Sequence, residues 1–275
     1  MHLIRFPSAA RFRAAADSFL LRHEAQHGLM LGILGELAEL PPGGLAVVAI
    51  DNGGSAEVLG VAFRLDTRLL VSRVEPDARD EFAQLLRKEP CSAVVGNAET
   101  VRAVTAAMAR AIEHSLAQGV YVNRRVMWPD RHPTGARRLA TPGDEETLIA
   151  WHIALSAAIG QRETLEHARE SIARRIASHA LHVWEDGGRI VSSAAAVGRT
   201  AHGVRINLVY TPLELRGRGY ASMLVADLTD ELLRDGREFV FLHTDLANPT
   251  SNRIYQRLGY ERAGDFLMAS FEPAN

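Results

Sequence analysis

The segment 216–221, with the sequence RGRGYA, places two glycines and two arginines between an apolar run and a helical pattern. Glycine permits backbone angles and close approaches that a Cβ atom forbids. Backbone amides at a helix start point outward, and with the positive end of the helix dipole they bind phosphate oxygens. Arg216 and Arg218 add positive charge. Taken alone, the segment predicts either a phosphate-binding turn or an ordinary connection between a strand and a helix.

The elements around this turn follow from their hydrophobic patterns. Residues 205–210 (RINLVY) predict a strand before the turn. A helix follows the turn, with one apolar face formed by Ala221, Leu224, Val225, Leu228 and Leu232. Residues 238–244 (EFVFLHT) predict a buried strand, and residues 248–259 (NPTSNRIYQRLG) predict a short helix closed by glycine.

Two motifs from these elements, taken together, resemble the cofactor-binding motifs of the GNAT superfamily of N-acetyltransferases. The first is R-x-x-G-x-A at 216–221, and the second is N-x-x-x-N-x-x-Y-x-x-L-G-Y at 248–260. The resemblance covers residues 138–271 and extends to the order of helices and strands. It implies the mixed α/β GNAT acyl-CoA N-acyltransferase fold, with acetyl-CoA as cosubstrate and no metal.

The resemblance also implies where acetyl-CoA binds. Its pyrophosphate would lie on the glycine-rich loop and its pantetheine arm along the preceding strand. The implied cofactor-binding residues are Leu208, Val209, Tyr210, Arg216, Gly217, Arg218, Gly219, Tyr220, Ala221, Ser222, Asn248 and Asn252. In the family a bulge splays this strand from its neighbour, and backbone amides near Val209 or Tyr210 would stabilise the oxyanion. For Asn248, the following proline favours a helix N-cap instead.

The sequence indicates a candidate general acid more clearly than a general base. Tyr255 matches the family tyrosine whose phenol protonates the departing thiolate, with a half-buried helix aromatic as the alternative. Many family members carry a glutamate as base on the strand before the loop, where this chain has Arg205 and Asn207. His243 and Asp245 are candidate bases, although loop capping would also explain them. A proton relayed through water is equally compatible with the sequence.

Composition excludes several classes of protein. The 275 residues carry a formal net charge of −2, which provides no electrostatic footprint for nucleic acid. No apolar run approaches the roughly 20 residues of a membrane span, and the N-terminus lacks the hydrophobic region of a secretory signal. Cys91 is the only cysteine, which excludes an internal disulfide. We therefore expect a cytoplasmic enzyme with neither nucleic acid nor a membrane as partner.

The first half of the chain repeats the element order of the second half. In each half a strand precedes a glycine-containing turn, at 51–54 and at 186–188, and two further strands run to a proline, Pro76 or Pro212. In the first half, however, Pro76 is followed by DARDEFAQLL, which contains no glycine. The first copy is therefore not expected to bind a pyrophosphate.

This repeat predicts two domains. Residues 1–130 are interpreted as a degenerate GNAT-like unit that supports the active half or walls its acceptor pocket, with an unrelated supporting α/β domain as the alternative. Residues 136–275 are predicted to form the GNAT N-acetyltransferase domain. The stretch 128–142, rich in proline and arginine, is predicted as the linker.

One competing motif, H-E-x-x-H, occurs at His23, Glu24 and His27. On a helix this spacing puts two imidazoles one turn apart for zinc, with the glutamate as general base of a peptidase. The histidines share a helical stripe with Phe19 and Met30, which favours burial against a core instead. No third ligand stands at a suitable spacing, so the motif is interpreted as structural.

The sequence thus predicts an N-acetyltransferase that moves an acetyl group from acetyl-CoA directly to a primary amine. The amine acceptor, a small molecule or a peptide, is not identified, because fold analogy does not name it. A non-catalytic module that binds acyl-CoA and regulates a partner is the alternative, which the missing base favours and Tyr255 opposes. The oligomeric state is open, with a homodimer among the options.

Overall fold

The computed structural model describes residues 1–41, 44–51 and 57–272. The turn predicted at 51–54 lies mostly outside these ranges. Within them, no helix combines the length and the apolar composition needed to cross a membrane.

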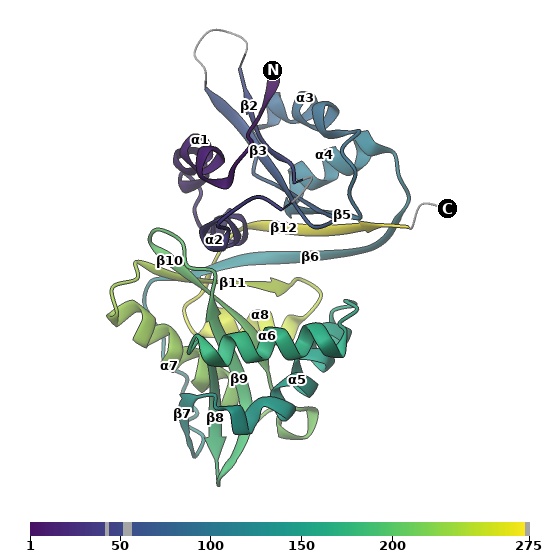
Figure 1. The fold of residues 1–275 in the computed structure, drawn as a ribbon. Coiled ribbons are helices and arrows are strands. Elements are labelled where there is room, and N and C mark those ends of the chain that lie inside the picture. The colour runs from purple at the N-terminus through teal and green to yellow at the C-terminus, as the bar shows by residue number, and fades with distance from the viewer. Residues whose placement is uncertain (42–43, 52–56, 273–275) are drawn as a thin grey trace. The chain divides into compact units, whose positions relative to one another are not determined.

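The chain divides into two compact units, each described here by itself (Figure 1). The first unit comprises Met1–Val120, Gly198–Ala201 and Ala263–Asn275, and the second comprises Tyr121–Val197 and His202–Arg262. The first unit therefore includes most of the last strand of the chain.

The first unit is built on a mixed sheet. Its elements are β1 (His2–Arg5), α1 (Ala9–Leu21), α2 (Gly28–Glu36), β2 (Ala46–Ile50), β3 (Val58–Leu65), β4 (Arg68–Val71), α3 (Pro76–Leu86), β5 (Ala93–Asn97), α4 (Ala98–Met108) and β6 (Ile112–Asn123). The strands from β1 to β4 pair antiparallel in chain order, and β4 pairs parallel with β5. On its other side β5 pairs antiparallel with β12 (Glu261–Phe271).

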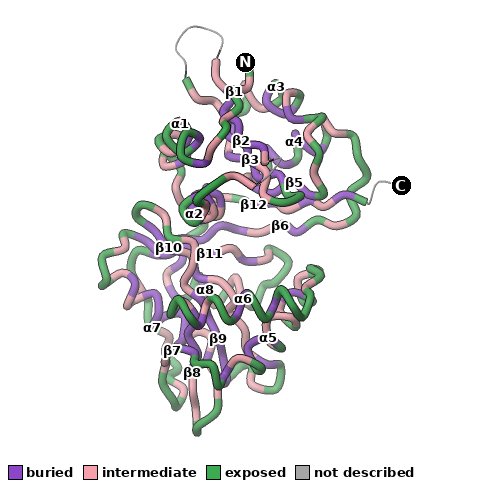
Figure 2. Tube along the Cα trace, in the orientation of Figure 1, coloured by how far each residue is buried: buried purple, intermediate pink, exposed green. Residues whose placement is uncertain are grey.

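Helices pack on both faces of this sheet, because successive apolar side chains of its strands point to opposite faces. In β2, Val47 and Ala49 pack with α3 and α4, whereas Ala46 and Val48 pack with α1 and α2. Strands β2 and β5 are accordingly buried along all but their last residue, and Figure 2 shows buried segments in purple. Helix α1 packs through Phe12, Ala16 and Leu20.

The second unit repeats this plan. Its elements are β7 (Ala136–Leu139), the 3₁₀ turn η1 (Pro142–Asp144), α5 (Glu145–Ala158), α6 (Leu165–Ala177), β8 (Leu181–Asp186), β9 (Arg189–Val197), β10 (Gly203–Tyr210), the 3₁₀ turn η2 (Leu213–Leu215), α7 (Tyr220–Arg234), β11 (Phe239–Asp245) and α8 (Pro249–Arg257), followed by the start of β12. The strands from β7 to β10 pair antiparallel in chain order, and β10 pairs parallel with β11. Apart from the two 3₁₀ turns, element order and pairing match those of the first unit, so the predicted internal repeat is confirmed.

Two apolar clusters cover the two faces of the strands of this unit. On one face, Leu224 and Leu228 of α7 and Tyr255 of α8 pack against strand residues that include Val204 and Ile206. On the other face, α5 and α6 pack against Ala195 and further residues of β8 and β9. Strand β10 therefore has α7 and α8 on one face and α5 and α6 on the other.

Two expectations about local structure are wrong. The stripe containing His23 and His27 does not lie on one helix, because α1 ends at Leu21 and a turn precedes α2. The predicted linker 128–142 is partly a strand, β7, because Arg137 and Arg138 on that strand are held by carboxylates of the second unit.

Candidate active site

Strand β10 carries a bulge just before the predicted phosphate loop. Its pairing with β9 is regular to Asn207, which lies opposite Ala195, and resumes at Tyr210 opposite Ser193. Leu208, between them, has a φ of 49°, in the left-handed region that non-glycine residues seldom adopt. The family bulge predicted near Val209 and Tyr210 is therefore present.

Two buried serines of β9 hold this bulge. The Ser193 hydroxyl donates to the carbonyl oxygen of Leu208 at 3.1 Å, and the Ser192 hydroxyl donates to that of Tyr210 at 3.0 Å. Both carbonyl groups are thereby satisfied without the regular strand ladder. No local sequence pattern marks these serines, because their role depends on the register between β9 and β10.

On its other edge, β10 stops pairing with β11 shortly before the bulge. The parallel pairing runs from Gly203 to Arg205 and stops before the bulge. Beyond that point the two strands no longer share a regular register, as expected for the splayed strands of the family. Asn207 lies beside this opening, and its side-chain oxygen Oδ1 is buried with no hydrogen-bond partner in the part of the chain that the structure describes.

The glycine-rich loop forms the predicted helix start. Gly217 and Gly219 have φ values of 75° and 92°, and Gly219 is the N-cap of α7. No side chain caps this helix, and its first turn carries no acidic residue. The first amides of α7, at Tyr220, Ala221 and Ser222, thus have no intrahelical partner and a favourable dipole for an anion.

The two arginines of this loop are tethered by their surroundings. Arg216 donates from Nε to the carbonyl oxygen of Thr211 at 2.9 Å, and its guanidinium carbon lies 6.0 Å from the Tyr210 ring centre. Arg218 donates to the carbonyl oxygen of Glu214 at 3.3 Å. Each guanidinium group keeps further donors for a phosphate, because only part of its five N–H groups is used.

Two residues that the sequence did not mark as site residues also hold this loop. Arg131, from the predicted linker, donates to the carbonyl oxygen of Gly217 at 2.6 Å. Asp186, at the end of β8, accepts a hydrogen bond of 2.6 Å from the phenol of Tyr220. That hydrogen bond raises the pKa of Tyr220 and lowers the pKa of Asp186. Both contacts join segments far apart in sequence, so no local pattern reveals them.

Tyr255 lies in the apolar cluster on the α7 side of the sheet, together with Tyr220, and Val209 packs against the same cluster. Its side chain is buried, and its ring centre is 5.8 Å from that of Tyr260. Burial raises the pKa of Tyr255 to about 12. The phenol therefore stays protonated at neutral pH, as a general acid must.

The two asparagines of α8 differ in their surroundings. Asn248 is the helix N-cap and accepts a hydrogen bond of 3.1 Å from the Ser251 amide. Asn252 donates to the carbonyl oxygen of Asp245 at 3.1 Å, while its own Oδ1 is buried and unpartnered in the described part of the chain. Asn248 thus has the capping role that its following proline indicates, and Asn252 keeps an acceptor for a ligand.

The two candidate bases are poorly suited to that role. Burial, with the charge of Arg205, lowers the pKa of His243 to about 3, so this imidazole binds a proton weakly. Asp245 accepts a hydrogen bond of 2.8 Å from the Ala247 amide and so caps the turn before α8. Neither residue is favoured as a base by this geometry.

A small pocket lies on the opposite face of the sheet, against α5. Its walls come from both helices of that face and from three strands, and they are formed by Leu148, Trp151, His152, Leu155, Ile172, Leu181, Ser193, Leu208 and Tyr210. The rings of Trp151 and Tyr210 are 5.7 Å apart. Leu208 and Tyr210 line this pocket, whereas Val209 packs on the Tyr255 side, so successive residues at the bulge face opposite sides of the sheet.

In the first unit, the helix start at the equivalent place is different. Helix α3 begins at Pro76 after Glu75, and Asp77 lies in its first turn. Acidic side chains at a helix N-terminus occupy the favourable dipole and repel a phosphate. The expectation that the first copy does not bind a pyrophosphate is consistent with this arrangement.

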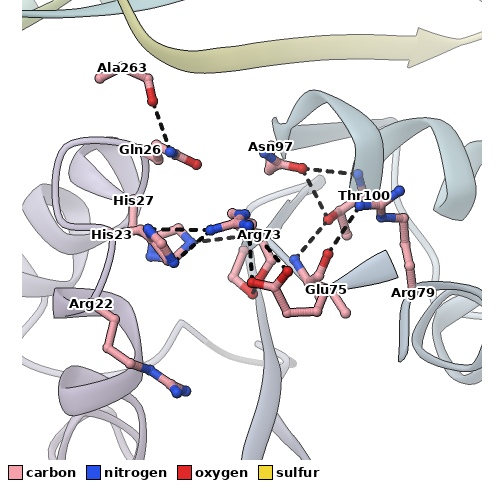
Figure 3. A network of polar contacts seen from close by, with 12 residues as sticks. Arg22, His23, Gln26, His27, Arg73, Glu75, Arg79, Asn97, Thr100 and Ala263 are labelled. Carbon is pink, nitrogen blue, oxygen red and sulfur yellow. Dashed lines mark hydrogen bonds and ion pairs between the residues drawn. The ribbon is translucent and has the colours of Figure 1, made fainter. Parts of the chain in front are cut away.

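The H-E-x-x-H histidines have structural partners in the first unit (Figure 3). His27 Nδ1 lies 2.8 Å from the Leu20 carbonyl oxygen, and its Nε2 accepts a hydrogen bond of 2.9 Å from the Arg73 amide. Both ring nitrogens are engaged, and burial lowers the pKa of His27 to about 4. The Arg73 guanidinium is 2.6 Å from His23 Nε2 and opposes a second cation there. The structure therefore favours the structural interpretation of this motif.

Comparisons with known proteins agree with this geometry. The sequence profile of the acetyltransferase (GNAT) family matches residues 147–260. A GCN5-related N-acetyltransferase from Sphaerobacter thermophilus is 20% identical, with a TM-score of 0.65 over 99% of this chain and 97% of that chain. A GNAT-family acetyltransferase from Colwellia psychrerythraea is 11% identical, with a TM-score of 0.61 over 99% of this chain and 100% of that chain. A Drosophila protein is 12% identical, with a TM-score of 0.69 over 99% of each chain.

Identities this low show a shared fold, and that fold extends over both units. Among curated proteins, none matches the chain at a significant level. Apart from residues 198–201, the matched range belongs to the second unit, where the bulge, the glycine-rich helix start and the buried tyrosine are found. Residues 147–260 of this chain therefore match the GNAT acetyltransferase family.

Proposed function

We propose that the second unit transfers an acetyl group from acetyl-CoA directly to a primary amine. The observation that carries this proposal is the course of β10, which passes through a serine-held bulge and leads into an uncapped, glycine-bounded helix start. A bulge exposes backbone groups for a thioester, and the helix start attracts a pyrophosphate. The bulge and the helix start follow one another along a single strand, and acetyl-CoA carries both a thioester and a pyrophosphate that suit them.

The glycine-rich loop fits a pyrophosphate in shape and charge. A Cβ atom placed on Gly217 would meet nothing within 4 Å, so the space in front of the loop is open. The amides that begin α7 supply donors, and Arg216 and Arg218 supply positive charge. Arg131 donates to the Gly217 carbonyl oxygen, and its side chain lies 3.5 Å from the position of a Cβ atom on Gly219.

The opening between β10 and β11 fits an amide-bearing arm. The buried Oδ1 atoms of Asn207 and Asn252 have no hydrogen-bond partner in the described residues. Buried acceptors without partners are uncommon in folded proteins. The N–H groups of a pantetheine arm are the donors that would satisfy them.

In the proposed reaction, the amine nitrogen attacks the thioester carbonyl carbon at the bulge, and backbone amides near Val209 stabilise the oxyanion. The C–S bond then breaks, and the leaving thiolate takes a proton from the Tyr255 phenol. The attacking nitrogen releases a proton to solvent to give the amide, and solvent restores the proton of Tyr255. The expected products are an N-acetylated amine and free coenzyme A.

Calorimetric titration with acetyl-CoA tests this proposal. Gly219→Glu places a carboxylate at the N-cap of α7, and Gly236→Glu places the same side chain just past the other end of that helix. The two glycines have φ values of 92° and 89°, so both variants carry the same backbone strain, about 1 to 2 kcal/mol. Gly236→Glu is therefore a matched control for loss of stability.

We expect saturable binding to the wild type and to Gly236→Glu, and none to Gly219→Glu. Titration with coenzyme A and with a longer acyl-CoA then defines the preferred acyl group. Equal binding by both variants would contradict the phosphate site. Binding by the wild type without transfer to any amine would instead support the regulatory alternative.

A further inference from the structure

The pocket beside the bulge contains one titratable imidazole, His152. Helix α5 directs Leu148, Trp151, His152 and Leu155 toward this pocket at helical spacing. The His152 side chain is only 10% exposed. Leu208 and Tyr210, which flank the bulge, line the same pocket.

The two ring nitrogens of His152 have different surroundings. Nε2 faces a carboxylate, with Glu163 Oε2 at 3.5 Å. Nδ1 is buried and has no hydrogen-bond partner in the part of the chain that the structure describes. Because buried polar atoms are almost always paired, an unpartnered nitrogen in a pocket wall indicates a ligand atom that completes it.

Glu163 is itself held in place just before α6. Its Oε1 lies 2.6 Å from His167 Nδ1 and accepts a hydrogen bond of 3.1 Å from the Thr164 amide. Its side chain is 12% exposed, so the carboxylate is poorly solvated. A carboxylate at Nε2 favours the tautomer with hydrogen on Nε2 and leaves the lone pair on Nδ1.

We propose that His152 is the general base of the acetyl transfer, with Glu163 as its positioning residue; this inference rests on the proposed function. Nδ1 accepts a proton from the ammonium group of the acceptor, and the imidazolium is stabilised through Nε2–H by the Glu163 carboxylate. The neutral amine then forms the C–N bond to the acetyl carbon, and the C–S bond breaks with its electron pair on sulfur. The thiolate takes the Tyr255 proton, and the attacking nitrogen releases its second proton to solvent to give the neutral amide. Solvent then restores the Tyr255 proton and takes up the proton on His152.

The charges around His152 are compatible with this role. Burial lowers its pKa, and Arg175 and His167 on α6 lower it further, whereas the Glu163 carboxylate raises it. Tyr210 on β10 faces the same pocket. The imidazole is therefore neutral at pH 7 and able to accept a proton.

The test compares His152→Gln with His179→Gln. His179 follows α6, is exposed and does not line the pocket. The rate is followed as thiol released from acetyl-CoA with 2-phenylethylamine, spermidine and a lysine-containing peptide as acceptors. Profiles of kcat/KM from pH 5 to 9, together with acetyl-CoA affinity, are measured for each protein.

We expect His152→Gln to lose about 10² to 10³-fold in kcat/KM and to lose the fall in rate at acidic pH. Its acetyl-CoA affinity should match that of the wild type, and His179→Gln should keep both rate and profile. Glu163→Gln gives an independent readout, because removal of the carboxylate lowers the pKa of His152 and moves the acidic fall to lower pH.

These outcomes distinguish a failure of the roles assigned to His152 and Glu163 from a failure of the proposed acetyl transfer. Acetyl transfer by His152→Gln at the wild-type rate and with the wild-type pH profile would overturn the role of His152 and leave the proposed function intact. A Glu163→Gln profile that falls in height without moving along the pH axis would overturn the positioning role. Absence of thiol release by the wild type with every amine would overturn the proposed function and this inference together.

Discussion

Ser193 and Leu208 are 15 residues apart, and the hydroxyl of the first lies 3.1 Å from the carbonyl oxygen of the second. This hydrogen bond satisfies a carbonyl group that the bulge removes from the strand ladder. It also holds Leu208 at a positive φ, which costs a leucine about 1 to 2 kcal/mol. The geometry of the candidate active site therefore depends on a side chain of the neighbouring strand.

Ser193→Ala should lower both stability and activity. An unsatisfied buried carbonyl group costs about 1 to 3 kcal/mol, so the free energy of unfolding should fall by that amount. We expect kcat/KM to fall about tenfold, because the bulge no longer aims its amides. Urea unfolding and steady-state kinetics measure the two effects. Ser178→Ala, an exposed position on α6's C-terminal end, is the control and should change neither.

Tyr255→Phe should lower kcat about 10²-fold or more without changing the acetyl-CoA dissociation constant, because the phenol acts only on the leaving thiolate. Since burial raises the pKa of Tyr255 to about 12, the wild-type rate should not fall through tyrosine ionisation between pH 7 and 10. Tyr260→Phe is the control. Its phenol bonds Thr229 at 2.7 Å, so that variant should lose stability and keep kcat. Equal kcat values for the wild type and Tyr255→Phe would rule out Tyr255 as the general acid.

The Arg138–Asp144 pair should make stability depend on acidic pH. Both Asp144 oxygens accept from the Arg138 guanidinium, at 2.7 and 2.9 Å, and this lowers the pKa of Asp144 to about 2. A carboxyl group with a lowered pKa stabilises the fold above its unfolded value near 4, and that contribution is lost as pH falls toward 2. Asp144→Asn should therefore lower the free energy of unfolding by about 2 kcal/mol at pH 7.

The measurement is urea unfolding of both proteins at pH 7 and at pH 3. The difference between wild type and Asp144→Asn should shrink at the lower pH, because the wild-type carboxylate is then partly protonated in the unfolded chain. A difference that stays constant between these pH values would contradict the linkage.

His27 should act through stability and not through metal. Because its pKa is lowered to about 4, the folded state resists protonation, and the unfolding free energy should fall as pH drops from about 6.5 toward 4. His27→Ala leaves two backbone groups without partners, so we expect a loss of about 3 kcal/mol. Treatment of the wild type with a chelator should change neither its melting temperature nor its activity. Chelator-sensitive activity would revive the zinc interpretation.

Several features of the fold follow from the sequence because their causes are local. The glycines at 217 and 219 and the apolar face of α7 lie within a few residues of each other, so spacing alone predicts a glycine-bounded helix start. The repeat is visible for the same reason, since each half carries the same succession of patterns. The broken helix at His23 was not predicted, because its turn is stabilised by contacts with Leu20 and with distant Arg73.

Local sequence patterns were enough to indicate the family that residues 147–260 match, the strand that leads to the glycine-rich loop, and Tyr255 as a candidate acid. Acetyl-CoA as cosubstrate, an amine as acceptor, a cytoplasmic location and the state of assembly stay predictions. The contacts of Ser193 with Leu208, of Arg131 with Gly217 and of His152 with Glu163 became visible in the folded unit. Helical spacing and turn chemistry act over a few residues, whereas strand register and helix packing set the neighbours of a side chain across the whole unit.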